Sequence, residues 1–192
     1  MIRLFIAWPL ATTVEQELGG IIEQLRKHGG RVSWLGRNNI HLTARFLGDT
    51  AEKQLPELKL LIDRVAVHSS TTQLTLDKLG AFPDMKRPRV IWAGLAGDTS
   101  PLRSIVDELE RGVREIGFAP ETKSFKPHLT LGRVKDTNGI EALMSAVQQV
   151  RVNAIPVVFD RIVLFKSMLA PKGAMYEKLH ERKVGGIDRI EG

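Results

Sequence analysis

The 192-residue sequence contains no cysteine and no long apolar run. The absence of cysteine excludes disulfide bonds, thiolate catalysis and thiolate metal ligands, and it fits a reducing compartment. No stretch approaches the roughly 20 apolar residues that a helix needs to span a bilayer. Pro9 interrupts the short apolar run near the start, so "LFIAW" favours a buried strand over a signal peptide. We therefore expect a soluble, cytoplasmic protein.

The charge balance is moderately basic, with 28 Lys and Arg against 22 Asp and Glu and a net charge of +6. This excess favours anionic partners such as RNA or phosphorylated metabolites. The glycine pairs in "GGIIEQ" and "GGRVSW" lack the spacing of a Rossmann or P-loop phosphate cradle, and no cofactor is expected. The chain is long enough for one compact domain or for two small lobes that share a core.

Hydrophobic periodicity predicts the order strand, helix, strands, helix, strands, helix, strand, helix, strands. This order indicates an α+β fold made of two similar halves, with no low-complexity linker between them. We expect a single two-lobed domain over residues 1–192, with a loose tail at residues 185–192. The helices are predicted at residues 12–28, 52–67, 100–116 and 138–149.

One short motif occurs twice, as "NIHLTARFLG" at residues 39–48 and as "KPHLTLGR" at residues 126–133. Alternate side chains of a strand share a face, so each histidine should lie beside the threonine that follows it, opposite the apolar residues. If the halves pack about a pseudo-twofold axis, the two polar faces meet across a groove. The side chains that we expect to face this groove are His41, Thr43, Arg45, His128 and Thr130.

Two histidines and two hydroxyl groups around a groove suit in-line displacement at phosphorus. One neutral imidazole can deprotonate the attacking oxygen while a protonated one donates to the leaving oxygen. The hydroxyl groups of Thr43 and Thr130 can hold non-bridging phosphate oxygens. A single histidine in a strand is more often a structural or surface group, but two copies at the same strand phase favour a functional pair.

Zinc is the main alternative use of His41 and His128. Catalytic zinc usually takes three protein ligands, and the sequence has no H-E-x-x-H helix. The two motif strands also contain no acidic residue, because Asp49 and Asp136 lie beyond the predicted strand ends. We therefore expect no metal site.

The paired segments "HLTARFLG" and "PHLTLGRV" resemble the two H-x-T-x signatures of the two-histidine phosphoesterase superfamily. The segments "RLFIAWPL", "LGAFPDMKRPRVIWAGL" and "LFKSMLAPKGAMYEKLHE" are similar to its prokaryotic branch, the RNA 2′,3′-cyclic phosphodiesterases, also described as 2′-5′ RNA ligases. The resemblance covers nearly the whole chain. It implies two pseudo-symmetric lobes, each an antiparallel sheet with helices on its outer face, flanking a central cleft.

The resemblance also implies an activity, the hydrolysis of an RNA 2′,3′-cyclic phosphate to a 2′-phosphate. By this resemblance His41 is the proton donor and His128 the proton acceptor; the predicted strand faces alone do not distinguish these roles. Thr43 and Thr130 match the threonines that hold the phosphate in this family.

Two arginines are candidates for a further phosphate contact. Arg133 matches a basic position of the family, but strict alternation places it on the face opposite His128. A bulge, a strand end or a curled side chain would bring it back, and otherwise it is a surface residue. Arg45 is the rival contact, because alternation places it on the His41 face.

Two other functions remain open at this point. The same acid–base pair could run the reverse reaction, which joins a cyclic phosphate end to a 5′-hydroxyl through a 2′-5′ linkage. The histidines could instead hold a terminal phosphate in an RNA-binding module without turnover. The expected partner is an RNA or oligonucleotide end with a 2′,3′-cyclic phosphate, with no membrane and no protein partner, and we expect a monomer.

Overall fold

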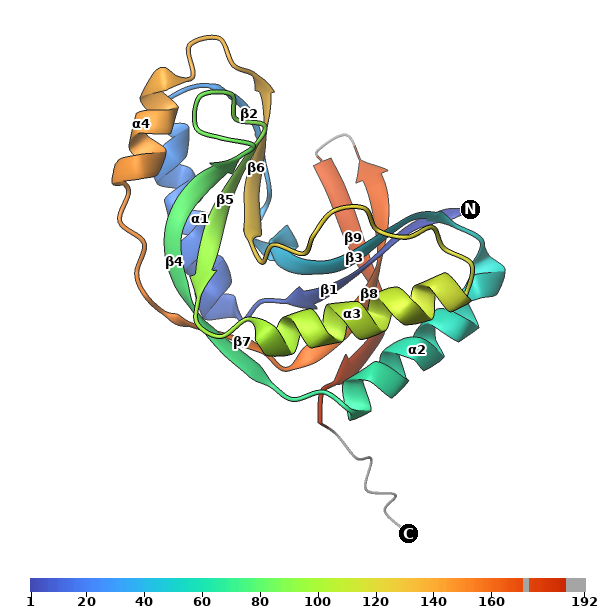
Figure 1. Cartoon of the computed structure of the whole chain (residues 1–192). Coiled ribbons are helices and arrows are strands. Elements are labelled where there is room, and N and C mark those ends of the chain that lie inside the picture. The colour runs from blue at the N-terminus through green and yellow to red at the C-terminus, as the bar shows by residue number, and fades with distance from the viewer. Residues whose placement is uncertain (171–172, 186–192) are drawn as a thin grey trace.

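The computed structural model describes residues 1–170 and 173–185 (Figure 1). These residues form four α-helices close to the predicted positions, and two short 3₁₀ turns at Arg37–Asn39 and Glu52–Gln54. The helices are α1 (Thr12–Arg26), α2 (Leu55–Val67), α3 (Ser100–Glu115) and α4 (Glu141–Gln149). The strands are β1 (Ile2–Pro9), β2 (Arg31–Trp34), β3 (His41–Thr50), β4 (Thr72–Phe82), β5 (Val90–Ala96), β6 (Leu129–Asp136), β7 (Pro156–Phe159), β8 (Arg161–Ala170) and β9 (Gly173–Lys183). The α+β prediction is confirmed.

The strands form one curled antiparallel sheet in the order β7-β4-β5-β6-β3-β1-β8-β9, and β2 pairs with β6. Two halves can be distinguished within it, because β3 and β6 pair only where Leu42 lies opposite Leu129. Each of these leucines is the middle residue of one H-L-T motif. The two motifs therefore meet at the junction between the halves of the sheet.

Two helices pack on each half of the sheet. Helices α2 and α3 lie side by side against β8, β9 and β3, whereas α1 and α4 lie together on the side of β4 and β5 (Figure 1). Helices α1 and α3 thus lie on the half opposite the strands that precede them, β1 and β5, whereas α2 and α4 lie on the same half as β3 and β6. The buried faces of all four helices enter a single hydrophobic core.

Close helix packing depends on one glycine. Gly112 of α3 faces Leu61 of α2, and a Cβ atom at residue 112 would overlap the Leu61 side chain. A glycine inside a helix costs roughly 1 kcal/mol relative to alanine. Here it allows α2 and α3 to approach closely over the β1, β3, β8 and β9 half of the sheet.

The central strand β1 is buried on both faces. Leu4, Ile6 and Trp8 enter the main core, whereas Phe5 and Ala7 form a second, smaller cluster with side chains of β8. This arrangement explains the continuous apolar run "LFIAW", since alternation is lost where both faces of a strand are covered. The second cluster lies on the sheet face that carries His41.

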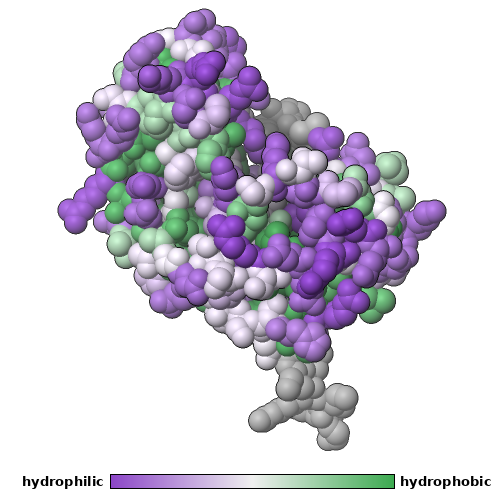
Figure 2. All heavy atoms as spheres, in the orientation of Figure 1, coloured by the Kyte–Doolittle hydropathy of each residue, from purple (hydrophilic) through white to green (hydrophobic). Residues whose placement is uncertain are grey.

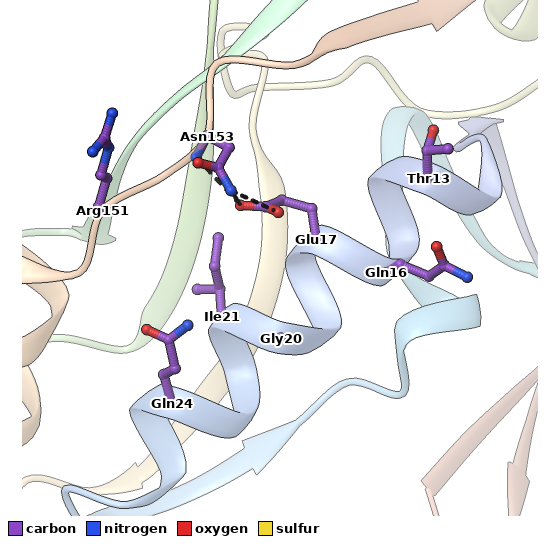
Figure 3. A pocket seen from close by; sticks show the side chains of 8 residues that line it. All are labelled: Thr13, Gln16, Glu17, Gly20, Ile21, Gln24, Arg151 and Asn153. Carbon is purple, nitrogen blue, oxygen red and sulfur yellow. Dashed lines mark hydrogen bonds between the residues drawn. The ribbon is translucent and has the colours of Figure 1, made fainter.

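The linker between α4 and β7 is attached to α1. The Asn153 amide nitrogen donates hydrogen bonds to both carboxylate oxygens of Glu17, at 2.9 and 3.1 Å (Figure 3). A hollow of about 360 Å³ lies beside this contact, lined by residues of α1 together with Arg151 and Asn153. None of the motif residues lines it.

The face seen in Figure 2 is largely hydrophilic, and it is hollowed between the upper part, which carries α4, and the part that carries α3. Among the described residues, no helix is both long and apolar enough to cross a membrane. The predicted tail lies mostly outside the described residues, at 186–192. Gly185, its first residue, is bonded through its N–H to the Ala66 carbonyl oxygen, at 2.9 Å.

Candidate active site

A β-bulge interrupts strand β3 directly after the first H-L-T motif. Thr43 pairs with Ala7 of β1, and Arg45 pairs with the preceding residue, Ile6, so Ala44 has no partner. An extra residue shifts the alternation of every side chain beyond it. Arg45 therefore lies on the core face, and the expectation that it shares the His41 face is wrong.

Arg45 is a buried structural group, with only 8% of its side chain exposed. Its Nε donates to Glu110 Oε2 and its Nη2 donates to the Ala119 carbonyl oxygen, each at 2.6 Å. A third hydrogen bond runs from Nη1 to the Phe46 carbonyl oxygen, at 2.6 Å. The guanidinium thus joins β3 to α3 and to the segment after α3.

That segment, residues 116–128, crosses from α3 back to β6 and ends at His128 (Figure 1). Glu110 also accepts a hydrogen bond from the Glu121 backbone N–H, at 2.9 Å. Arg103 of α3 donates to the Phe125 carbonyl oxygen, at 3.1 Å. Arg45, which lies two residues after Thr43, therefore takes part in fixing the path that leads to the second motif.

Strand β6 contains a bulge at the equivalent place. Thr130 pairs with Trp92 of β5, and Gly132 pairs with Ile91, so Leu131 is the extra residue. The bulge returns Arg133 to the face that carries Thr130. Of the four explanations left open for Arg133, the bulge is the one that the structure contains.

The two motif histidines make the same hydrogen bond. His41 Nδ1 lies 2.7 Å from the Asn39 carbonyl oxygen, and His128 Nδ1 lies 2.7 Å from the Lys126 carbonyl oxygen. A carbonyl oxygen only accepts, so Nδ1 carries a proton in both rings. Nε2 of each ring is then the nitrogen that can take up or release a proton. His128 lies one residue before β6, whereas its strand was predicted to include it.

The aromatic neighbours of the two imidazoles differ. Phe5 stacks on His41 with ring centroids 4.7 Å apart, and Tyr176 meets the same ring edge-on at 5.4 Å. Phe82 meets His128 at a right angle, with centroids 5.0 Å apart. Burial lowers the pKa of His41 from 6.5 to about 4, and it also lowers the pKa of His128. The positive charge of Arg133 acts in the same direction on both rings.

A cavity of about 110 Å³ lies beside His41, and residues from both halves of the sheet line it. Four of the predicted residues line it. His128 is not among the lining residues, but its charge contributes to the lowered pKa of His41. Sequence reasoning missed the other five, although alternation along β1 and β8 could have indicated Phe5 and Ser167. The residues that line the cavity are Phe5, Leu35, His41, Thr43, Phe46, Thr130, Arg133, Ser167 and Tyr176.

The hydroxyl groups of Thr43 and Thr130 have no hydrogen-bond partner within residues 1–170 and 173–185. Arg133 likewise forms no ion pair with a described carboxylate. These groups are therefore available to bind an anion at the cavity that His41 lines. Over the same residues, no group of three or more His, Cys, Asp or Glu side chains is arranged to hold a metal ion.

Comparison with known proteins identifies close relatives. The family described as the 2′-5′ RNA ligase superfamily matches residues 14–168. A relative from Aeropyrum pernix, named RNA 2′,3′-cyclic phosphodiesterase, is 36% identical over 156 residues, which cover 79% of this chain and 86% of the relative. A relative of the same name from Thermotoga maritima is 32% identical over 188 residues, 97% of this chain and 98% of the relative.

Solved structures share the fold. A Thermus thermophilus protein superimposes with a TM-score of 0.80 at 27% identity, over 96% of this chain and 99% of the other. The structure of E. coli LigT complexed with 3′-AMP gives a TM-score of 0.75 at 23% identity, with the same two coverages. With the family match over most of the sequence, these findings show that the chain belongs to the 2′-5′ RNA ligase superfamily, within the two-histidine phosphoesterases.

Proposed function

We propose that this protein is an RNA 2′,3′-cyclic phosphodiesterase, which hydrolyses a terminal 2′,3′-cyclic phosphate to a 2′-phosphomonoester. The observation that carries the proposal is the paired arrangement of the imidazoles, in which a carbonyl oxygen holds each Nδ1 and leaves each Nε2 for chemistry. Thr43, Thr130 and Arg133 supply anion-binding groups at the same cavity. The relatives that bear this name support the assignment.

The proposed reaction is an in-line displacement at phosphorus. Nε2 of neutral His128 accepts a proton from water, and the water oxygen bonds to phosphorus. The bond from phosphorus to the 3′ oxygen breaks, and Nε2 of protonated His41 donates its proton to that oxygen. Thr43, Thr130 and Arg133 hold the non-bridging oxygens and stabilise the charge that builds up on them. The donor and acceptor roles follow the family resemblance.

The low pKa of His41 has a consequence for this mechanism. A ring with a pKa of about 4 is mostly neutral at neutral pH, whereas a proton donor must be protonated. A phosphodiester anion between the rings favours the imidazolium form and raises its pKa. Substrate binding should therefore be coupled to proton uptake by His41.

This coupling predicts two different pH profiles. kcat/KM reports the free protein, in which both histidine pKa values lie below 6.5, so it should follow a bell with its maximum on the acid side of neutrality. kcat reports the complex, in which the bound anion raises both pKa values, so its bell should lie at higher pH. Initial rates from about pH 4 to about pH 9 measure both profiles. A kcat/KM that still rises above neutrality would contradict a histidine donor.

The product and the metal requirement are tested in one assay. A short RNA ending in a 2′,3′-cyclic phosphate is incubated with the protein in excess chelator, and the product isomer is identified. We expect a 2′-phosphate at an unchanged rate. A 3′-phosphate would show that the 2′ oxygen leaves instead, and loss of activity that zinc or magnesium restores would overturn the metal-independent mechanism.

Two other outcomes of that assay would change the proposed activity. Adding an RNA with a free 5′-hydroxyl tests ligation, because the same acid–base pair can run the reaction backwards. A 2′-5′ linked product that exceeds hydrolysis would make ligation the main activity. Salt-dependent RNA binding without any product would favour a binding module, since phosphate contacts release counterions.

We also propose that the protein acts in the cytoplasm as a monomer, on RNA or oligonucleotide ends. The lack of cysteine supports a reducing compartment. Both histidines and both threonines of the site come from one chain, so the site needs no second copy.

A further inference from the structure

Asn39, whose carbonyl oxygen holds the His41 ring, makes a second contact through its side chain. The amide Nδ2 donates a hydrogen bond to the Ala174 carbonyl oxygen, at 2.8 Å. Asparagine side chains in turns commonly bond the backbone of their own turn. Here the partner lies 135 residues away in the sequence, near the start of β9. The side chain therefore joins the turn before β3 to a distant strand.

This hydrogen bond does not belong to the strand pairing of the sheet. Strands β1 and β8 lie between β3 and β9 in the sheet order, and β9 ends that order. An end strand presents backbone N–H and C=O groups along one edge that have no strand partner, and these groups can bond side chains from outside the sheet. Ala174 lies two residues before Tyr176, whose ring meets His41 edge-on. Asn39 thus connects His41 with the strand that carries one of its aromatic neighbours.

The turn that contains Asn39 is short. The 3₁₀ turn Arg37–Asn39 spans three residues, and the Asn39 N–H donates to the Gly36 carbonyl oxygen at 2.8 Å. The hydrogen bonds of a 3₁₀ turn have poorer geometry than those of an α-helix, so the turn alone fixes its last carbonyl group weakly. The contact with Ala174 gives the same residue a second attachment point. Its carbonyl oxygen is the one that lies 2.7 Å from His41 Nδ1.

The second motif has a comparable attachment. The Lys126 carbonyl oxygen holds His128. The adjacent Phe125 carbonyl oxygen accepts a hydrogen bond from Arg103 of α3, at 3.1 Å. In both motifs, a side-chain donor joins the segment before the histidine to another part of the fold. The attachment at Asn39 is the more direct of the two, because the same residue also bonds the imidazole.

A proton donor must point its nitrogen at the leaving oxygen, within hydrogen-bond reach. Productive catalytic geometry tolerates deviations of only about 0.5 Å. The Asn39 carbonyl oxygen sets the direction of His41 Nδ1, and therefore the direction of Nε2 on the other side of the ring. Any freedom of residue 39 is passed on to the nitrogen that carries the transferred proton.

We infer that Asn39 is a positioning residue for the proton donor: its side-chain amide fixes the carbonyl group that holds Nδ1 of His41, and so directs Nε2. The inference rests on the proposed function and deepens it by adding a residue that acts through His41. Asn39 is not among the residues that line the cavity. Its side chain should therefore affect the chemical step more than substrate binding.

The first test replaces Asn39 by leucine, which removes the side-chain donor at a similar size and keeps the backbone carbonyl group. We expect kcat to fall about tenfold with KM within about twofold of wild type, because misplacing a catalytic group slows the chemical step. Asn39→Gln, which keeps an amide, should recover part of kcat. Asn38→Leu is the matched control, since Asn38 is exposed and its side chain forms no hydrogen bond within residues 1–170 and 173–185. Unchanged kcat in Asn39→Leu, or an equal loss in Asn38→Leu, would overturn the inference.

The pH profile separates positioning from a general loss of structure. Burial lowers the pKa of His41, and the hydrogen bond to the Asn39 carbonyl oxygen raises it, so a weaker bond should lower that pKa further. In Asn39→Leu, the limb of the kcat/KM bell that His41 governs should move to lower pH while the other limb stays. Arg133 and His128, whose charges also act on His41, are unchanged in this variant. Partial unfolding would lower the rate at every pH and move neither limb, and that outcome would contradict a positioning role.

A measurement without substrate distinguishes failure of the inference from failure of the proposed function. Long-range proton–nitrogen correlation spectra of protein with isotope-labelled histidine show which nitrogen of each neutral imidazole carries the proton, and His41→Ala identifies the His41 signals. We expect the Nδ1–H form in wild type and in Asn38→Leu, and a mixture of Nδ1–H and Nε2–H forms in Asn39→Leu. A pure Nδ1–H form in Asn39→Leu would refute the inference. If wild type hydrolyses no cyclic phosphate but Asn39→Leu still shows the mixture, the proposed hydrolysis fails and the positioning role stands.

Discussion

Replacement of His41 or His128 by alanine should lower kcat by about 10³-fold, because in the proposed mechanism each imidazole moves one of the two protons. The two rings act on one transition state, so the double variant should lose only slightly more than either single variant. Single-turnover hydrolysis of an RNA with a 2′,3′-cyclic phosphate measures these losses.

Two further histidines provide matched controls for this experiment. His28 and His68 are exposed and lie outside the cavity, so alanine at either position should leave kcat at the wild-type value. Thermal unfolding of each variant separates lost chemistry from lost structure, which matters for His41 because its ring packs on Phe5. Retention of more than about a tenth of wild-type kcat in either motif variant would exclude that ring from proton transfer.

Replacement of Arg45 by methionine should lower the free energy of unfolding by about 3 kcal/mol. The substitution leaves Glu110 without its cation and removes three hydrogen bonds of 2.6 Å. Removing one member of a buried ion pair costs more than the pair itself contributes, because the remaining charge is uncompensated. For a chain of this size, Tm should fall by about 9 °C, as measured by calorimetry or circular dichroism.

The control is an exposed ion pair that joins α2 to α3. Arg64 lies 3.9 Å from Glu115, and both side chains are more than half exposed, so Arg64→Met should cost less than about 1 kcal/mol. At temperatures well below the Tm of the variant, where it is folded, we also expect Arg45→Met to lower kcat, because the segment that Arg45 fixes ends at His128. Arg45→Lys should recover part of that loss. If Arg45→Met and Arg64→Met lower Tm equally, Arg45 does not stabilise the contact of β3 with α3 and the segment 116–128 more than an exposed ion pair would.

For each motif, the sequence predicts which side chains share a face of the strand, but only as far as the threonine. Alternation predicted that His41 lies beside Thr43, and both line the same cavity. The next residue of each motif is a bulge, which depends on how β3 pairs with β1 and how β6 pairs with β5. Nothing in the spelling "HLTAR" or "HLTLGR" distinguishes an extra residue from a paired one. Strict alternation, continued past each bulge, therefore placed Arg45 and Arg133 on the sheet faces opposite to those that they occupy in the structure.

The aromatic neighbours of His41 could not be predicted from the sequence either. Phe5 and Tyr176 come from strands at opposite ends of the chain, and only the order β3-β1-β8-β9 brings them to His41. The depression of the His41 pKa follows from that packing and not from any adjacent residue. Glu110 gave no signal either, because its partner Arg45 lies 65 residues away in the sequence.

The sequence by itself determined the α+β class, the four helices and the identity of the two-histidine family, since hydrophobic period and motif spelling are local properties. The tertiary structure decided the single curled sheet, the half of the sheet on which each helix packs, and the faces on which Arg45 and Arg133 lie. Each of these depends on which strands pair and in which register. Register is set by contacts between residues distant in the chain, and one unpaired residue reverses every side chain after it.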